Sequence, residues 1–425
     1  MPSESIFTMD TSSIKYGPGA TAEVGQDAVD RGIRRVALFT DPIVAETIAY
    51  DVALSSLKSA GLDVVCFSTV RVEPNDASFE EAIEFANDAR ADGYVAVGGG
   101  SVIDTAKAAN LYATWPADLL TYVNAPIGQA QPVPGPLKPL IAIPTTAGTG
   151  SETTGVAIFD LEEMHAKTGI AHRALRPALG IVDPVNTVSL PPMVTASSAL
   201  DVLSHAIESF TALPFNARPA PAQPRLRPAY QGANPISDIW ASKAMTMVAR
   251  YLPQVLERPD DLEARGQMML AATYAGIGFG NAGVHLPHGM SYPVAGMVRS
   301  WRPAGYQTDH AIVPHGISVI LNAPAVFRFT AVALPARHIE AAHLLGADIA
   351  TVREENAGDV LANRLIEIMR ATEMPNGLGA VGYSEADIED LVGGTLPQHR
   401  VTKLAPRPAS ADDLRALFHD AMRYW

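Results

Sequence analysis

The first half of the chain alternates short apolar runs with longer amphipathic ones. Runs rich in β-branched and aromatic residues at 36–41 and 63–70 predict strands, and a third at 94–101 breaks into glycines. Between them, residues 45–61 and 78–93 have the apolar spacing and end signals of helices. Strands that alternate with helices form a parallel sheet covered on both faces. The pattern therefore predicts an α/β domain of the Rossmann-like, nucleotide-binding type.

The strand pattern fades towards residue 192, and long helical patterns dominate from residue 193 onward. We therefore expect two domains: an α/β nucleotide-binding domain at 1–192 and an all-α domain at 193–425. A chain of 425 residues with 48% apolar and 18% charged residues has room for both.

Composition excludes several classes of protein. The balance of 31 basic and 45 acidic residues, a net charge of −14, argues against nucleic acid and anionic membranes as general partners. The single cysteine, Cys66, excludes an intrachain disulfide framework and a thiolate metal site. No apolar run reaches the ~20 residues that span a bilayer. Residues 1–13 carry acids and lack the apolar core of a signal peptide, so we expect a cytoplasmic protein.

One helical stretch, residues 201–210, carries a candidate metal site. Asp201 and His205 stand one turn apart in an otherwise apolar segment, so both side chains point the same way. A buried Asp–His hydrogen bond that serves packing is the alternative. Downstream, His288 and His315 each precede a glycine. These four N/O donors would suit Fe²⁺ or Zn²⁺ with one position left open for a substrate oxygen.

Glycines mark the expected nucleotide site. Gly98, Gly99 and Gly100 would let a ligand approach the backbone, and Ser101 starts a helix whose free N–H groups favour a pyrophosphate. A plain tight turn is the alternative. Asp41, at the end of the first strong strand, can bind ribose hydroxyls and repel a 2′-phosphate, which would favour NAD over NADP. It could equally be a turn aspartate before proline.

A second loop, residues 141–154, also follows a strand-like run. Its hydroxyl groups can donate to phosphate or ribose, and they belong to Thr145, Thr146, Thr149 and Ser151. Two such loops at the ends of two strands predict one cofactor site.

Five stretches together resemble the signatures of the iron-containing (group III) alcohol dehydrogenase family, over nearly the whole chain. In order they are GGGSVIDTAK, IPTTAGTGSE, DVLSHAIESF, GVHLPHGM and VPHG. Further stretches resemble the family members that move hydride between hydroxyacids and oxoacids, such as IKYGPGATAEVG, PAYQGANPISDIWA and TLPQHRVTKLAP. The resemblance implies the architecture that this family shares with dehydroquinate synthase.

The resemblance also assigns roles to residues. It implies NAD, a divalent metal with Fe²⁺ favoured over Zn²⁺, and the metal ligands Asp201, His205, His288 and His315. The implied cofactor residues are Asp41, Gly98, Gly99, Gly100, Ser101, Asp104, Thr145, Thr146, Thr149, Ser151 and Lys167. One departure concerns Tyr292, which stands where many of these enzymes have a histidine. We take His285 and Tyr292 as catalytic candidates, and His285 as a histidine packed in the site wall is the alternative.

The resemblance implies hydride transfer from 4-hydroxybutyrate to 2-oxoglutarate through bound NAD, giving succinate semialdehyde and 2-hydroxyglutarate. A conventional NAD-dependent alcohol or hydroxyacid dehydrogenase is the alternative, and a lyase of the dehydroquinate synthase kind is a third hypothesis. The partners would be small hydroxyacids and oxoacids, with assembly as a homo-oligomer, a dimer. Both substrates carry a remote carboxylate, so a cation is expected nearby. Its candidates are Arg218, Arg225, Arg227, Arg299, Arg302 and Lys403, each with a solvated surface position as the alternative.

Overall fold

The computed structural model describes residues 3–162, 166–308 and 310–425. Contacts within the chain divide it into two compact units. One comprises Asp10–Leu190 together with Pro259–Gly276. The other comprises the N-terminal segment up to Met9, Pro191–Arg258 and Ile277–Trp425.

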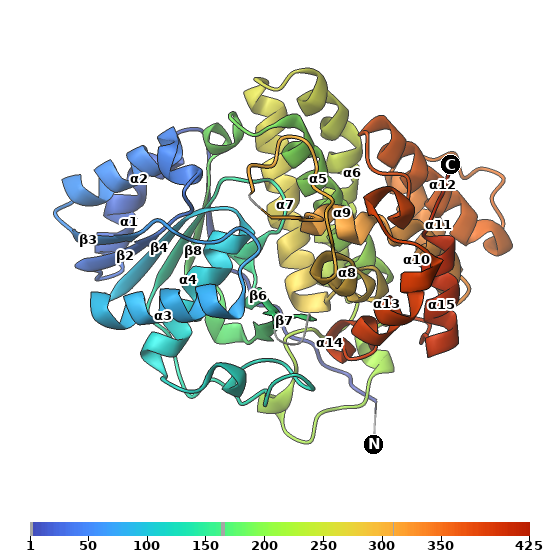
Figure 1. The fold of residues 1–425 in the computed structure, drawn as a ribbon, viewed down its shortest axis with the longest axis horizontal. Coiled ribbons are helices and arrows are strands. Elements are labelled where there is room, and N and C mark those ends of the chain that lie inside the picture. The colour runs from blue at the N-terminus through green and yellow to red at the C-terminus, as the bar shows by residue number, and fades with distance from the viewer. Residues whose placement is uncertain (1–2, 163–165, 309) are drawn as a thin grey trace. The chain divides into compact units, whose positions relative to one another are not determined.

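The first unit is built on a six-stranded parallel sheet (Figure 1). Its strand order is β1-β8-β5-β4-β2-β3. The strands are β1 (Ser13–Tyr16), β2 (Arg35–Phe39), β3 (Asp63–Phe67), β4 (Gly93–Gly98), β5 (Leu140–Pro144) and β8 (Leu179–Val182). The three predicted strands correspond to β2, β3 and β4, which confirms the α/β class of this half.

Helices cover both faces of this sheet because its inner strands are buried on both sides. Leu38 of β2 packs in one apolar cluster with helices α1 (Val24–Asp30) and α2 (Ile48–Ser59). Its neighbour Phe39 packs in the opposite cluster with α3 (Asp76–Ala89) and α4 (Gly100–Thr114). Successive side chains of a strand point to opposite faces, so apolar residues at both positions require cover on both.

Local hydrogen bonds place the helix starts differently from the prediction. Helix α2 begins only at Ile48, because Asp41 Oδ1 accepts from the backbone N–H groups of Ile43 and Val44 and holds a separate turn before it. Helix α3 begins at Asp76, since Asn75 Oδ1 accepts from Ser78 N at 2.8 Å and caps the helix. An antiparallel hairpin, β6 (Val156–Leu161) and β7 (Ala166–Ala171), was not predicted.

The second unit is made of helices, which confirms the all-α class of this half. They are α5 (Pro192–Thr211), α6 (Pro235–Glu257), α8 (Leu286–Gly296), α9 (His315–Ile320), α10 (Ala323–Thr330), α11 (Pro335–Leu344), α12 (Ala357–Ala371), α13 (Ile388–Thr395), α14 (His399–Thr402) and α15 (Ala411–Asp420). Helix α7 (Leu262–Ala282) has residues in both units. Helix α5 is buried almost throughout. No helix within the described residues is long and apolar enough to cross a membrane.

We expected the two domains to meet between residues 192 and 193, and two segments of the chain belong to the other unit than this division implies. The N-terminal segment pairs with the helical unit, since Thr8 N donates to Gln231 Oε1 at 2.9 Å. The segment Pro259–Gly276 belongs to the sheet unit, where a Cβ on Gly276 would lie 2.3 Å from Thr153 Oγ1. Contacts between segments far apart in sequence leave no local pattern, so hydrophobic periodicity could not locate them.

Candidate active site

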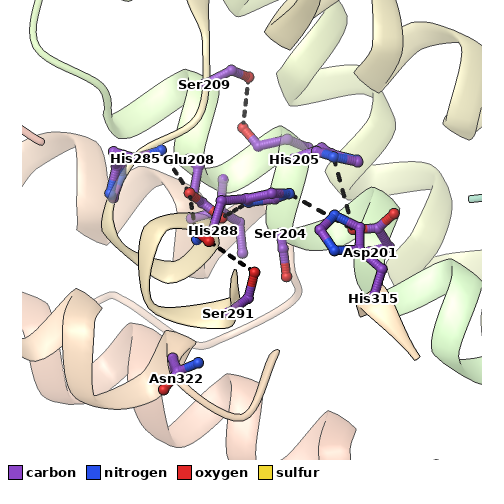
Figure 2. Close-up of polar contacts among 12 residues, drawn as sticks. Asp201, Ser204, His205, Glu208, Ser209, His285, His288, Ser291, His315 and Asn322 are labelled. Carbon is purple, nitrogen blue, oxygen red and sulfur yellow. Dashed lines mark hydrogen bonds and ion pairs between the residues drawn. The ribbon is translucent and has the colours of Figure 1, made fainter. Parts of the chain in front are cut away.

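Four donor side chains converge within the helical unit (Figure 2). Asp201 and His205 come from α5, His288 from the first turn of α8, and His315 is the first residue of α9. One ligand atom from each lies within 4.8 Å of the others. Asp201 Oδ1 is 3.7 Å from Nε2 of His205, 3.8 Å from Nε2 of His288 and 3.7 Å from Nε2 of His315. The four predicted ligands are thus brought together.

These distances and the state of the imidazoles fit a divalent cation. They exceed the length of a hydrogen bond, whereas donors around a tetrahedral ion stand roughly 3.4 Å apart. His288 Nε2 is buried and makes no hydrogen bond to any described residue. Burial lowers the pKa of His288 to about 3 and that of His205 well below its usual value, so both imidazoles are neutral, the form that binds metal.

The glycine that follows each downstream histidine lets chain segments pack closely. A Cβ on Gly316 would lie 2.0 Å from the carbonyl oxygen of Ser197, so α9 approaches α5 in direct contact. A Cβ on Gly289 would lie 2.7 Å from Thr402 Cγ2, which brings α14 against α8. Packing therefore requires the two glycines, and the proposed metal site uses the histidine that precedes each of them.

Glu208, which was not among the predicted site residues, contacts the centre directly. Its Oε1 lies 2.5 Å from His288 Nδ1, and its Oε2 accepts from His285 N at 2.7 Å. The carboxylate is fully buried, and burial raises the pKa of Glu208 to about 7. A carboxylate on the outer nitrogen of a ligating histidine fixes its ring and tautomer. An acid three residues after His205 in an apolar helix was the available signal.

A second unpredicted contact holds His205. The ring of Phe279 stacks on its imidazole with centroids 3.9 Å apart and an interplanar angle of 8°. Two of the three histidines are therefore fixed by neighbours outside the donor set.

The catalytic candidates His285 and Tyr292 lie in different surroundings. His285 Nε2 is 3.0 Å from Thr211 Oγ1, and its ring meets Phe327 edge-on. Figure 2 shows it on the far side of Glu208 from Asp201. This arrangement favours the alternative of a histidine packed in the wall. The buried Tyr292 accepts a hydrogen bond from Arg400 at 2.8 Å.

In the sheet unit, the two predicted cofactor loops lie side by side. They follow β4 and β5, which pair in parallel with Gly98 opposite Pro144. A Cβ on Gly98 would lie 2.4 Å from Val102, and one on Gly100 would lie 2.6 Å from Thr149. A Cβ on Gly99 would meet only Thr146, at 3.4 Å. Packing thus requires two of the glycines, while Gly99 leaves room above the start of α4.

Several predicted cofactor residues make hydrogen bonds within the unit. Asp104 accepts from Ser151 Oγ at 2.5 Å and from Ile158 N at 3.0 Å. The buried Lys107, which sequence analysis missed, donates to Ser151 Oγ at 2.5 Å and to Val156 O at 2.7 Å. Burial lowers the pKa of Lys107, and Asp104 partly opposes that shift. This cluster holds the second loop against α4.

The two outlying cofactor candidates also have structural partners. Asp41 forms the turn after β2, as its alternative interpretation stated, and burial raises its pKa. Lys167 pairs with Glu73 and, at 3.3 Å, with Asp160. Ser101 Oγ accepts from Glu73 N at 3.1 Å. Contact of these residues with a cofactor stays a prediction.

The candidate cations are engaged or exposed. Arg227 pairs with Glu4 at 3.0 Å and Arg218 donates to Tyr230 O at 2.8 Å. Arg299 pairs with Asp387, Arg302 is exposed and donates to Thr308 O, and Lys403 is exposed. The side chain of Arg225 lies outside the described part of the structure.

Two family models match the chain. The model for iron-containing alcohol dehydrogenase matches residues 11–184, and the model for the C-terminal part of the Fe-containing alcohol dehydrogenase family matches residues 229–422. The chain belongs to the iron-containing alcohol dehydrogenase family. It is therefore an oxidoreductase.

Curated members of this family are similar over nearly their whole length. The mitochondrial hydroxyacid-oxoacid transhydrogenases of Bos taurus and Homo sapiens are each 55% identical over 421 residues, 99% of this chain and 90% of theirs. The probable mitochondrial hydroxyacid-oxoacid transhydrogenase of Dictyostelium discoideum is 51% identical over 98% of this chain and 79% of its own length.

Solved structures of iron-containing alcohol dehydrogenases and related reductases share the fold. A 1,3-propanediol oxidoreductase superposes with a TM-score of 0.85 at 26% identity, covering 98% of this chain and 100% of that one. Sulfoacetaldehyde reductase from Bifidobacterium kashiwanohense, in complex with NAD⁺, has a TM-score of 0.77 at 26% identity, covering 98% of each chain. NAD and a divalent metal therefore fit this family member.

The expected cytoplasmic location is wrong, because these similar transhydrogenases are mitochondrial. That expectation rested on residues 1–13 and on overall composition. Import depends on a targeting segment that the folded domains do not need, so fold and composition do not decide the compartment.

Proposed function

We propose that this oxidoreductase moves hydride from a hydroxyacid to an oxoacid through NAD that stays bound between the two half-reactions. The observation that carries the proposal is the convergence of Asp201, His205, His288 and His315 in one buried centre. The identity of 55% to hydroxyacid-oxoacid transhydrogenases over 99% of the chain supports this reaction class.

Asp201, His205, His288 and His315 would hold the metal ion, which we propose to be Fe²⁺, with Zn²⁺ as the alternative. The bound ion would supply Lewis acidity that lowers the pKa of a substrate hydroxyl group. The metal content of protein purified without air tests the identity of the ion.

The chain's own residues prepare the centre for this chemistry. Glu208 fixes the ring of His288, and Phe279 fixes the ring of His205. Asp201, His205 and His288 are buried, while the His315 side chain is 24% exposed. Asp201, His205 and His288 are thus shielded from water, and we propose that the substrate enters beside His315, the most exposed of the four ligands.

We propose that NAD binds at the carboxyl ends of β4 and β5. Gly99 would leave space for the pyrophosphate at the start of α4, beside Gly98, Gly100 and Ser101. The hydroxyl groups of the second loop would face the cofactor, and they belong to Thr145, Thr146, Thr149 and Ser151. Asp104 would hold Ser151 in place through its hydrogen bond, and Asp41 would bind the ribose. Lys167 would lie near the cofactor and would hold Glu73 and Asp160 in place through its ion pairs.

The proposed substrates are 4-hydroxybutyrate as donor and 2-oxoglutarate as acceptor. The test incubates metal-loaded protein with both and with no free NAD. We expect succinate semialdehyde and 2-hydroxyglutarate in equal amounts over many turnovers, and ping-pong kinetics. Product that appears only with added NAD, together with stoichiometric NADH, would make the chain a conventional alcohol or hydroxyacid dehydrogenase instead.

The proposed assembly is a homodimer with small-molecule partners only. Light scattering on protein eluted from a size-exclusion column measures the mass of the assembly, which is compared with the 45.0 kDa of one chain.

A further inference from the structure

Arg400 lies against the helix that carries His288. Its Nη2 donates to Tyr292 Oη at 2.8 Å, and Tyr292 stands one turn after His288 on α8. Its guanidinium group lies 5.0 Å from the centroid of the Tyr230 ring. The close packing of Thr402 on Gly289 holds the short helix α14, and Arg400 with it, against the metal-binding turn.

Two series of contacts fix Arg400 relative to two of the proposed metal ligands. From Arg400 it runs through Tyr230 to Phe279, whose ring is 6.5 Å from that of Tyr230, and from Phe279 to His205. In the other direction it runs through Tyr292 to the helical turn of His288. These contacts fix the guanidinium group relative to His205 and to the helical turn of His288.

Within the described part of the chain, the charge of Arg400 has no acidic partner. Among the described residues, no carboxylate forms an ion pair with it, and its Nη1 is buried without a hydrogen bond. Burial would lower the pKa of Arg400, but the oxygens of Tyr292 and Tyr230 outweigh burial and raise it, so the group stays charged. Buried guanidinium groups are normally paired with an anion. This side chain has the properties of an anion receptor.

We propose that Arg400 binds the remote carboxylate of the hydroxyacid and oxoacid substrates, and that Tyr292 positions it. The proposal rests on the proposed function, which supplies substrates of this chemistry. A planar guanidinium group matches a carboxylate with two parallel N–H donors, and Nη1 is available for one of them. The receptor would select acids over uncharged alcohols of the same length.

The kinetic test compares Arg400→Gln with the wild-type chain, both loaded with metal and NAD and both supplied with 2-oxoglutarate as the hydride acceptor. The measured quantity is kcat/KM for 4-hydroxybutyrate divided by kcat/KM for 1-butanol, which has the same number of carbons and no charge. We expect this ratio to fall about 100-fold, mainly through KM for the acid, because a desolvated charge contact is lost. Lys243→Gln, an exposed position on α6 with the same change of charge, should change the ratio less than about 3-fold.

A binding test is independent of turnover. Calorimetry measures the affinity of the metal-loaded protein for butyrate, an unreactive carboxylate, and we expect Arg400→Gln to weaken it at least about 10-fold. If Arg400→Gln does not fold, Tyr292→Phe removes only the hydroxyl group that accepts from Nη2, and it should lower both the butyrate affinity and the kinetic ratio. An unchanged ratio and unchanged butyrate affinity in the folded variant would overturn the proposal.

The two tests separate the inference from the proposed function. If the wild-type chain turns over 4-hydroxybutyrate and the ratio does not depend on Arg400, the function stands and the inference is overturned. If butyrate binding depends on Arg400 but neither acid is turned over, the carboxylate site stands and the proposed reaction is overturned.

Discussion

Glu208 determines which nitrogen of His288 faces the metal centre. Its carboxylate lies 2.5 Å from Nδ1, so the proton of a neutral imidazole resides there and the lone pair is on Nε2. That Nε2 is the atom 3.8 Å from Asp201 Oδ1. Orientation of a ligand by its outer hydrogen bond contributes to metal affinity.

Replacing Glu208 by Gln should weaken metal binding by a factor of about 10 to 100, because the amide keeps the shape of the carboxylate but loses its charge. Titration of the apoprotein against a chelator of known affinity measures this. Ser209→Ala is the matched control, since Ser209 Oγ donates only within α5, to Ala206 O at 3.1 Å. Wild-type metal affinity in Glu208→Gln would contradict the role of Glu208.

A buried histidine away from the centre should make stability depend on pH. His338 Nδ1 donates to Leu334 O at 2.8 Å, and its Nε2 lies 2.9 Å from Thr330 Oγ1. Burial lowers the pKa of His338 from 6.5 to about 4. The unfolded chain therefore binds more protons between these values, and the contribution of His338 to stability is lost as pH falls through this range.

At pH 5 this loss should be about 2 kcal/mol relative to pH 7. The free energy of unfolding in urea, measured at both pH values, gives the loss for the wild-type chain. In His338→Gln, which cannot take up a proton, the fall between the two pH values should be smaller by that amount. Equal falls in both proteins would assign the acid sensitivity to other groups.

At the residue scale, helical spacing paired two of the proposed metal ligands, and the residues that support the ligands depend on contacts far apart in sequence. Asp201 and His205 could be paired from the sequence because one helical turn separates them. Glu208 and Arg400 could not be selected, since their importance comes from contacts with partners 80 and 108 residues away. Sequence alone does not distinguish a buried charge from an exposed one.

At the element scale, the start of α4 separates glycines that packing requires from one that a ligand could require. Gly98 and Gly100 have neighbours closer than 3 Å to an added Cβ. Gly99 is the N-cap of α4 with φ −74°, a conformation open to any residue, and its added Cβ would meet Thr146 at 3.4 Å. The fold alone therefore does not demand glycine at position 99.

Gly99→Ala should leave stability within about 1 kcal/mol of the wild type and lower NAD affinity, because a methyl group would occupy the space proposed for the pyrophosphate. Gly100→Ala should lose about 1–3 kcal/mol of stability, since Thr149 must move. Fluorescence titration with NADH and urea unfolding measure the two quantities. Unchanged NADH affinity in Gly99→Ala would move the pyrophosphate away from this loop.

Elements with a strong pattern were predicted, and those fixed by side-chain hydrogen bonds were not. The buried strands β2 and β4 have continuous apolar runs, and the edge strand β3 has a run of β-branched and aromatic residues. The hairpin of β6 and β7 places Asp160 opposite Lys167 in the ladder, and such internal charges obscure a strand pattern. The late start of α2 follows from the turn held by Asp41, which periodicity does not record.

At the scale of the whole molecule, the four donors all belong to one of the two compact units. A ligand that binds only the folded state stabilises what it binds, by about 2.7 kcal/mol at a concentration of 100 times its Kd. The metal should therefore stabilise the helical unit much more than the sheet unit. Removal of the metal by a chelator should therefore destabilise the helical unit and leave the sheet unit nearly unchanged.

Amide hydrogen exchange followed by mass spectrometry should show the difference by segment. On removal of the metal, exchange in α5, α8 and α9 should accelerate, by up to about 100-fold where opening breaks the centre. Exchange in β2, β4 and β5 should change little. His288→Ala, which removes one donor, should show the fast pattern with or without metal. Equal acceleration in the strands would mean that the two units open together, so that the metal stabilises the chain as one cooperative structure.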